Sequence, residues 1–365
     1  MDPVLSKITE LNGALNFTIS GINVSIANGL RRIACEIPCV VFRTTPHEAN
    51  LAAFEVNTTR MNNELLKQRL SCIPIYADED FPVNDYILVV DKQNKTNTNE
   101  YVTTADFQVV NVATKQVDKA LSAKLFPANS ITGDYPELAR LLPRVSENIE
   151  GERLAIKAKF VLATAKENSS FNVSAVFVYN NTPDPVKIKA AWTDKKTELA
   201  KTLSAPELAF AEKDWYLLDA KRQFLPDSFD FTIETVGPMT NMAIVSKSTK
   251  LMIDKLTLLQ DTIQSDPTLI AASETTIPNS FDIILKGEDY TLGKVIECIL
   301  YETHYDKTLN YCGFRKPHPH IDISIIRLGF KAPTDIINVA TYIVNAANEA
   351  IRIYTKIGKV FEVAE

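Results

Sequence analysis

The chain has 365 residues, of which 45% are hydrophobic and 23% charged, and this globular composition excludes collagen-like and disordered classes. Its net charge of -6 excludes a protein that binds DNA or an acidic membrane through an overall positive charge. No stretch approaches the roughly 18 apolar residues that span a bilayer, and the start of the chain does not resemble a secretory signal. The five cysteines form neither a disulfide framework nor a zinc ribbon. We expect no membrane association and a reducing compartment.

The first elements are a strand, a tight turn and a helix. Residues 14–20 alternate between apolar and polar, which predicts a half-buried strand. A helix follows, with Ser25 suited to cap its start and Pro38 to end it. Its apolar face carries Ile26, Leu30, Ile33 and Ile37. Its opposite face carries Asn28, Arg31, Arg32 and Glu36.

Residues 46–150 interrupt this pattern and are predicted to form an inserted, mainly β subdomain. After the insert, residues 152–164 and 171–179 alternate as strands, whereas 181–225 is charged and shows no regular pattern. Strands and helices mix without βαβ alternation, so we predict an α+β fold with largely antiparallel sheets. The elements expected inside the insert are a helix at 64–70, strands at 86–90 and near 101–110, a polar hairpin tip at 91–100 and a turn-rich segment at 130–144.

The strand, turn and helix recur near the end of the chain. The offset that aligns Gly21 with Gly287 also pairs Asn23 with Asp289 and Ser25 with Thr291. Each copy is followed by a long amphipathic helix, which starts near residue 238 or 334. We interpret this as an internal duplication. We expect the two separately folded modules to pack as a pseudo-symmetric pair, because burying even 1,000 Å² of apolar surface contributes about 25 kcal/mol before entropy.

The predicted first module covers 1–45 and 151–264, the insert 46–150, an unpatterned linker with two prolines 265–279, and the second module 280–365. The apolar helix positions are expected to form the interface between the modules. These residues are Ile26, Leu30, Ile33, Leu292, Ile296, Ile299, Ile343, Ala347 and Ile351.

No sequence motif for catalysis is present: there is no phosphate-binding GxxxxGK[ST], GxGxxG, HExxH or GxSxG segment. His318 and His320 have donor types suited to zinc, but no second close cysteine pair completes a tetrahedral site. We therefore predict no metal, no cofactor and no catalytic residue. Arg31 and Arg32 leave three interpretations open: a solvated face with an Arg32–Glu36 pair, a nucleic-acid contact, or docking onto another protein.

Several ordered motifs resemble the alpha-like family of DNA-dependent RNA polymerase assembly subunits, which includes the third-largest eukaryotic subunit, its archaeal counterpart and bacterial alpha. The segments SIANGLRR at 25–32 and LLKQRLSCIPIYAD at 65–78 carry this resemblance, and ITGDYPELARLLP, ATAKENSSFNVSAVFVY and FTIETVGPM follow in the family's order. Residues 281–328 and the closing helix resemble the eleventh eukaryotic subunit and its archaeal counterpart. In cellular polymerases these are separate chains, whereas here they are joined, as in polymerases of nucleocytoplasmic large DNA viruses.

The resemblance implies a non-catalytic assembly subunit that docks the largest and second-largest polymerase subunits and small subunits similar to the tenth and twelfth. DNA and RNA would be contacted only indirectly, through the complex. It implies a location in the virion and host cytoplasm or in the host nucleus. Residues 79–150 lack cysteine, so the zinc or iron–sulfur group of some relatives is not expected. The alternative is a standalone nucleic-acid-binding protein. The residues predicted to bind partners are Asn28, Arg31, Arg32, Glu36, Arg69 and Lys294.

Overall fold

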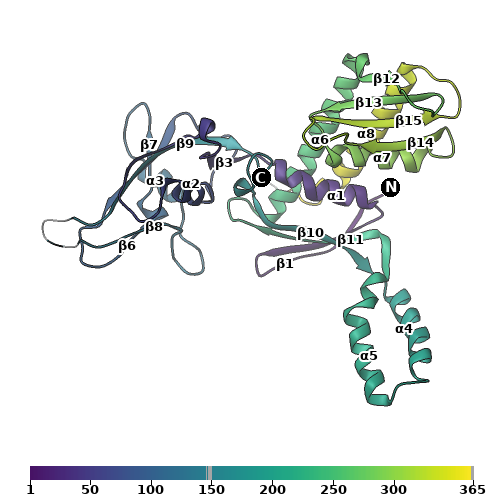
Figure 1. Ribbon diagram of the computed structural model, residues 1–365, viewed down its shortest axis with the longest axis horizontal. Coiled ribbons are helices and arrows are strands. Elements are labelled where there is room, and N and C mark those ends of the chain that lie inside the picture. The colour runs from purple at the N-terminus through teal and green to yellow at the C-terminus, as the bar shows by residue number, and fades with distance from the viewer. Residues whose placement is uncertain (145, 147–149, 363–365) are drawn as a thin grey trace. The chain divides into compact units, whose positions relative to one another are not determined.

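The computed structural model describes residues 1–144, 146 and 150–362 and divides the chain into two compact units. Antiparallel strand pairs occur in both units, and helices pack on the sheets, so the predicted α+β class is confirmed. Figure 1 shows the helices and strands, coloured from purple at the N-terminus to yellow at the C-terminus. Unit 1 contains Met1–Ala34, Val176–Glu234 and Asn241–Glu365, and unit 2 contains Cys35–Ala175 and Thr235–Thr240.

The first sheet of unit 1 joins strands that lie more than 200 residues apart in the sequence. Its elements are β1 (Val4–Leu11), β2 (Ala14–Ser20), β10 (Ser174–Pro183) and β11 (Phe224–Thr235), with α1 (Val24–Ile33) and α6 (Asn241–Ser265). The strand order is β1-β2-β11-β10. Phe17 of β2 stacks on Phe231 of β11 with ring centroids 5.1 Å apart, and α6 packs against β2.

The second sheet of unit 1 is formed by the last quarter of the chain, in the order β12-β13-β15-β14. Its elements are β12 (Ile270–Ala272), β13 (Ser280–Lys286), β14 (Leu309–Arg315) and β15 (Ile323–Phe330), with α7 (Tyr290–His304) and α8 (Ile336–Gly358). The predicted linker 265–279 is therefore wrong in part, because β12 lies inside it and pairs with β13. A three-residue strand is too short to show a period in the sequence.

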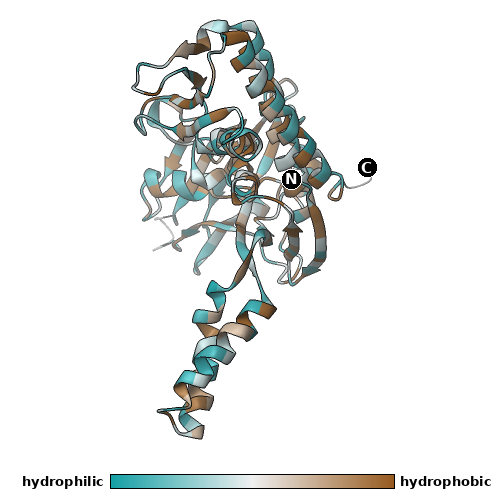
Figure 2. Cartoon of the chain, turned by 90° about the vertical axis from the view of Figure 1, so that its right-hand side faces the viewer, coloured by the Kyte–Doolittle hydropathy of each residue, from teal (hydrophilic) through white to brown (hydrophobic). Residues whose placement is uncertain are grey.

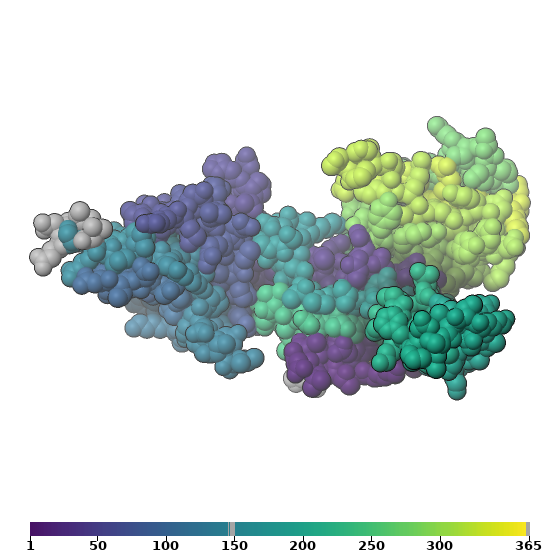
Figure 3. Space-filling view, turned by 60° about the horizontal axis from the view of Figure 1, so that its bottom comes forward, coloured from purple at the N-terminus to yellow at the C-terminus, as the bar shows by residue number. Residues whose placement is uncertain are grey.

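The stretch 181–225, which shows no regular pattern in the sequence, contains two helices, α4 (Pro185–Leu199) and α5 (Ala205–Leu217). Trp192 and Trp215 hold them together, with ring centroids 6.0 Å apart. Apart from its tryptophan, neither helix has a fully buried side chain, so neither sequence shows the regular apolar spacing of an amphipathic helix. The hairpin extends from the ends of β10 and β11 in Figure 2 and forms a teal-green lobe in Figure 3.

Unit 2 is built around the long strand β9 (Arg153–Ala163), which pairs with three other strands. Its other elements are β3 (Cys39–Phe42), β4 (Ala52–Asn57), β5 (Tyr86–Gln93), β6 (Glu100–Thr103), β7 (Gln108–Asn111), β8 (Glu137–Leu141), α2 (Asn63–Ser71) and α3 (Lys119–Leu125). The predicted domain boundaries thus differ from the observed units. Residues 35–45 and 151–175, expected in the first module, lie in unit 2, because β3 and β9 complete its sheet. The second module shares unit 1 with the rest of the first and is not a separate unit.

The polar segment 91–100 is not the tip of a hairpin. Strand β5, which ends inside it at Gln93, pairs with β7 and β9, whereas β6, which begins at Glu100, pairs with β8 in a separate two-stranded sheet. Asn94 is fully buried, and its side-chain amide donates hydrogen bonds to the carbonyls of Thr98 (2.8 Å) and Leu141 (3.0 Å). The segment therefore connects two different sheets, and the buried side chain of Asn94 stabilises this connection.

Candidate subunit interface

Helix α1 begins at a tight turn that requires glycine. Gly21 has φ +75°, and a Cβ at this position would collide with the carbonyl of Asp2. The side chain of Asn23 then caps the helix by accepting a hydrogen bond from the amide of Ser25 (2.9 Å). The cap and the turn fix the direction of α1, so that Ile26, Leu30 and Ile33 are buried and its polar side faces outward.

Helix α7 begins in the same way. Gly287 has φ +72°, and the Asp289 side chain accepts a hydrogen bond from the amide of Thr291 (2.7 Å). Leu292, Ile296 and Ile299 lie on its buried face. The two helices therefore start from equivalent turns and caps, although α7 lies more than 250 residues downstream.

Helices α1 and α7 pack against each other, and Gly29 of α1 faces Val295 of α7 and Tyr354 of α8. A Cβ on Gly29 would lie 2.6 Å from the Tyr354 hydroxyl and 2.9 Å from Cγ2 of Val295, closer than ordinary contact allows. The Tyr354 hydroxyl donates a hydrogen bond to the Ile26 carbonyl (3.1 Å). Burial raises the pKa of Tyr354 well above its ordinary value, so this phenol stays protonated and remains a donor.

Polar contacts lock the ends of the two helices. Arg32 donates from Nε to Oγ1 of Thr291 and from Nη2 to Oδ2 of Asp289, both at 3.0 Å, and thereby binds the start of α7. In the opposite direction, Nδ2 of Asn23, the cap of α1, donates to Oε1 of Glu302 on α7 (2.8 Å), and the same oxygen accepts from the Cys298 thiol (3.8 Å). Burial raises the pKa of the Cys298 thiol to about 12. Each helix therefore contacts the first turn of the other.

Helices α6 and α8 form a second long contact in unit 1. Nε2 of Gln260 donates to the Val344 carbonyl (3.1 Å) and to Oδ1 of Asn348 (2.8 Å). Lys255 of α6 forms an ion pair with Glu288, just before α7, at 3.0 Å. The four helices are thus joined by apolar packing and by specific polar contacts.

Eight of the nine predicted interface residues are at most 3% exposed, and the exception is Ile351, which is only half-buried. On α8 the fully buried positions nearby are Ile353, Tyr354 and Ile357. Ile351 lies at the edge of the stripe that these residues continue, so its place in the interface stays a prediction. The predicted interface did not include Gly29, Val295 or Tyr354. The signal for Gly29 was a glycine inside an otherwise regular helix.

Arg31 and Asn28 occupy the outer side of α1. Nε and Nη2 of Arg31 both donate to Oδ1 of Asn28, at 3.1 and 3.0 Å. Both side chains are half-exposed. An arginine carries five N–H donors, and the bonds to Asn28 use two of them. The amide holds the guanidinium in place, and a planar cationic group in a fixed position suits a carboxylate or a carbonyl of another protein.

The other residues predicted to bind partners have contacts within the chain. On α7, Lys294 pairs with Glu297 at 2.8 Å. In unit 2, Arg69 donates to the carbonyls of Leu138 and Glu137, both at 2.7 Å, and so ties α2 to β8. Whether these residues also meet a partner stays a prediction.

The helical Arg32–Glu36 pair expected from an i, i+4 spacing is wrong. Helix α1 ends at Ile33, and Glu36 belongs to a short 3-10 helix (Ala34–Glu36). There its carboxylate lies 3.5 Å from Nζ of Lys166. The i, i+4 spacing brings side chains together only while the helix continues, which explains the difference.

The described residues contain no group of three His, Cys, Asp or Glu side chains placed to hold a metal ion. The rings of His318 and His320 are tilted against each other, with centroids 5.2 Å apart, in the exposed turn between β14 and β15. In the part of the chain that the structure covers, no helix combines the length and apolar character that crossing a bilayer requires.

Comparison with known proteins relates most of the chain to RNA polymerase subunits. Residues 16–256 match the family described as RNA polymerase Rpb3/Rpb11 dimerisation domain. The chain is 22% identical over 306 residues to DNA-directed RNA polymerases IV and V subunit 3B of Arabidopsis thaliana, covering 71% of this chain and 92% of that protein. It is 23% identical over 264 residues to subunit Rpo3 of Pyrococcus furiosus, covering 66% and 90%. It is 29% identical over 116 residues to polymerase subunit R470 of Acanthamoeba polyphaga mimivirus, covering 30% and 28%.

Proposed function

The chain belongs to the RNA polymerase Rpb3/Rpb11 dimerisation domain family, and on this premise we propose that it is a non-catalytic assembly subunit of a multisubunit DNA-directed RNA polymerase. The observation that carries the proposal is the contact between α1 and α7, because it supplies within one chain the kind of pairing for which the family is described. A rigid body that binds two large partners raises their effective concentration for each other.

We infer further that unit 1 combines two related halves, one similar to the third-largest subunit and one similar to the eleventh. The alignment of Gly21 with Gly287 also places Gly29 opposite Val295, and these two residues meet where the helices cross. The same alignment equates Asn23 with Asp289, the residues that cap the two helices. Each cap is bound by a side chain of the other helix, Asp289 by Arg32 and Asn23 by Glu302. Reciprocal contacts of this kind are expected at a two-fold interface.

The outer faces of the two halves are alike in position but differ in charge. The alignment equates the Asn28–Arg31 pair of α1 with the Lys294–Glu297 pair of α7, and both are i, i+3 contacts. The first pair is cationic and the second is neutral overall. This difference supports the proposal that the α1 face docks the second-largest subunit and the α7 face approaches the largest subunit, with small subunits similar to the tenth and twelfth nearby.

The proposed fusion and the similarity to a mimivirus polymerase subunit support an origin in a large DNA virus. In that case the protein acts in the virion and host cytoplasm or in the host nucleus. The net charge of -6 supports an indirect role in nucleic-acid contact.

Purification of the tagged full-length protein from its native source tests the proposal. Two very large polypeptides are expected to accompany the wild-type chain. Arg31→Ala should reduce their recovery at least about tenfold, as expected for a central arginine of an interface. Arg32 is a poor test residue, because it also binds Asp289. Arg222→Ala is the matched control, since Arg222 is an exposed arginine in the short 3-10 helix between α5 and β11.

Absence of the two large polypeptides from the wild-type preparation would refute the assembly role. Full recovery with Arg31→Ala would refute the assignment of the α1 face. DNA affinity of the isolated chain that falls steeply with salt would instead favour the standalone nucleic-acid-binding protein.

A further inference from the structure

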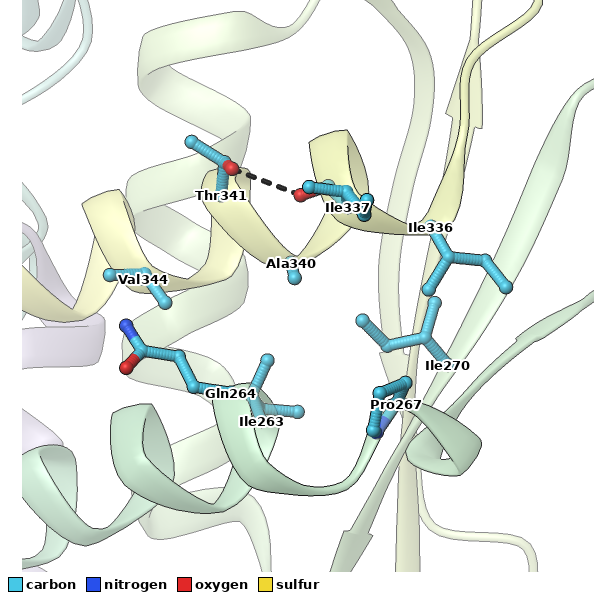
Figure 4. A pocket seen from close by; sticks show the side chains of 9 residues that line it. All are labelled: Ile263, Gln264, Pro267, Ile270, Ile336, Ile337, Ala340, Thr341 and Val344. Carbon is cyan, nitrogen blue, oxygen red and sulfur yellow. Dashed lines mark hydrogen bonds between the residues drawn. The ribbon is translucent and has the colours of Figure 1, made fainter.

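An apolar groove opens between the end of α6 and the start of α8, on residues that the proposed docking faces do not use. Its volume is about 290 Å³. Figure 4 shows the facing side chains of α6 and α8, with Ile270 of β12 and Pro267 closing one end. Its lining is Ile263, Gln264, Pro267, Ile270, Ile336, Ile337, Ala340, Thr341 and Val344.

The exposed isoleucines of this groove distinguish it from an ordinary part of the core. Ile337 is 78% exposed and its neighbour Ile336 is 40% exposed, although both lie in the first turn of α8. Ile263 and Ile270 form a floor that is only 2% exposed. Two exposed isoleucines beside a buried apolar floor are typical of a surface that another molecule covers.

The size and chemistry of the groove favour side chains over a cofactor. Cavities that enclose drug-sized ligands occupy about 300–1,000 Å³ and place several polar groups around the ligand. This groove lies at the lower limit, and Thr341 uses its hydroxyl to donate to the Ile337 carbonyl (2.9 Å). A groove between two helices with apolar walls is the usual site for the apolar face of a third helix.

The charge around the groove identifies the kind of helix. The segments that form it, 257–277 and 333–345, contain four carboxylates and no lysine or arginine, and the nearest lysines along the chain, Lys255 and Lys331, lie just outside them. Asp335 caps α8 by accepting a hydrogen bond from the amide of Asn338 (2.8 Å). Asp266 accepts a hydrogen bond from the amide of Thr268 (3.1 Å). The side chain of Asp266 also interacts electrostatically with Lys286 of β13. The hydrogen bonds of Thr268 lower the pKa of Asp266, so that it is ionised at neutral pH. The end of α6 adds the negative end of a helix dipole. The four carboxylates are Asp261, Asp266, Glu274 and Asp335.

We propose that this groove binds a basic amphipathic helix of a partner protein, which inserts apolar side chains between α6 and α8 and places lysines or arginines near the surrounding carboxylates. The partner is recognised by this combination of apolar anchors and positive charge. This binding site is independent of the α1 and α7 faces, so it can be tested without reference to the polymerase.

The test uses the full-length chain and a designed peptide of about 18 residues, a length at which an isolated helix begins to form. The peptide carries leucine at positions i, i+3, i+4 and i+7 and lysine elsewhere, and a second peptide replaces every lysine by glutamate. Binding is measured by fluorescence anisotropy at two salt concentrations. The variants are Ile337→Gln, which removes an apolar wall without adding charge, and Asp261→Lys. The matched controls lie on the α4–α5 hairpin: Val186→Gln, which changes a residue with the same 78% exposure, and Asp194→Lys.

The proposal expects the lysine peptide to bind and the glutamate peptide to bind at least about tenfold more weakly. Ile337→Gln and Asp261→Lys should each raise the dissociation constant about three- to tenfold, and the two hairpin controls should leave it unchanged. Equal binding of both peptides, or equal effects of groove and hairpin variants, would overturn it. So would self-association of the wild-type chain that Ile337→Gln abolishes, because a second copy would then be the occupant.

Discussion

The crossing of α1 and α7 at Gly29 makes a quantitative prediction for Gly29→Ala. At an open position in a helix this substitution stabilises by about 1 kcal/mol, because alanine has the higher helix propensity. At Gly29 the new Cβ would lie 2.6 Å from the Tyr354 hydroxyl and 2.9 Å from Val295. Overpacking a core costs about 1–3 kcal/mol. Displacing the hydroxyl from the Ile26 carbonyl costs about 1 kcal/mol more. The propensity gain offsets the lost hydrogen bond, so we expect a net destabilisation of about 1–3 kcal/mol.

Hydrogen exchange of the α1 amides, with urea unfolding followed by circular dichroism, measures this effect. Tryptophan fluorescence is unsuitable, because Trp192 and Trp215 both lie in the α4–α5 hairpin. Tyr354→Phe provides the control, since it removes the atom nearest to the new Cβ and by itself costs about 1 kcal/mol. The double variant should be more stable than the sum of the single effects predicts, by about 1–2 kcal/mol. Stabilisation by Gly29→Ala, or simple additivity in the double variant, would refute the proposed close packing.

Three further predictions concern the cap of α7, the hairpin and the cysteines. Asp289→Ala should destabilise unit 1 by about 1–2 kcal/mol in urea, since it removes both the cap of Thr291 and the ion pair with Arg32, and unchanged stability would contradict this. Trp192→Ala should cost the hairpin about 3–5 kcal/mol and accelerate hydrogen exchange in α4 and α5 while α1 stays protected; acceleration in α1 would show that the hairpin does not unfold alone. Ellman's reagent at pH 8 should react quickly with the exposed thiols of Cys35 and Cys72 and slowly with the other three until urea is added, because burial raises the pKa of those three. Fast reaction of all five would contradict the buried packing. The slow thiols are Cys39, with a pKa raised to about 11, and Cys298 and Cys312, with pKa values raised to about 12.

Elements whose pattern is local were predictable from the sequence. The glycine turns at Gly21 and Gly287 and the amphipathic helices after them appear where spacing and capping residues indicated. The family resemblance also rested on contiguous motifs such as residues 25–32, and residues 16–256 match that family. Apolar spacing and caps act over a few residues, so a single sequence is sufficient to identify them.

Contacts between segments that are far apart in the sequence became evident only in the tertiary structure. The guanidinium of Arg32 binds the cap of a helix 257 residues away, a contact that no local spacing indicates. Strand β9 joins unit 2 because its partners lie there, although its alternating pattern fits either sheet. The α4–α5 hairpin is held together by one pair of tryptophans, and one buried residue in each helix is too few to produce a regular apolar spacing in the sequence. Local pattern determines which face of an element is buried, whereas the element that covers this face is determined by the free energy of the whole packed chain.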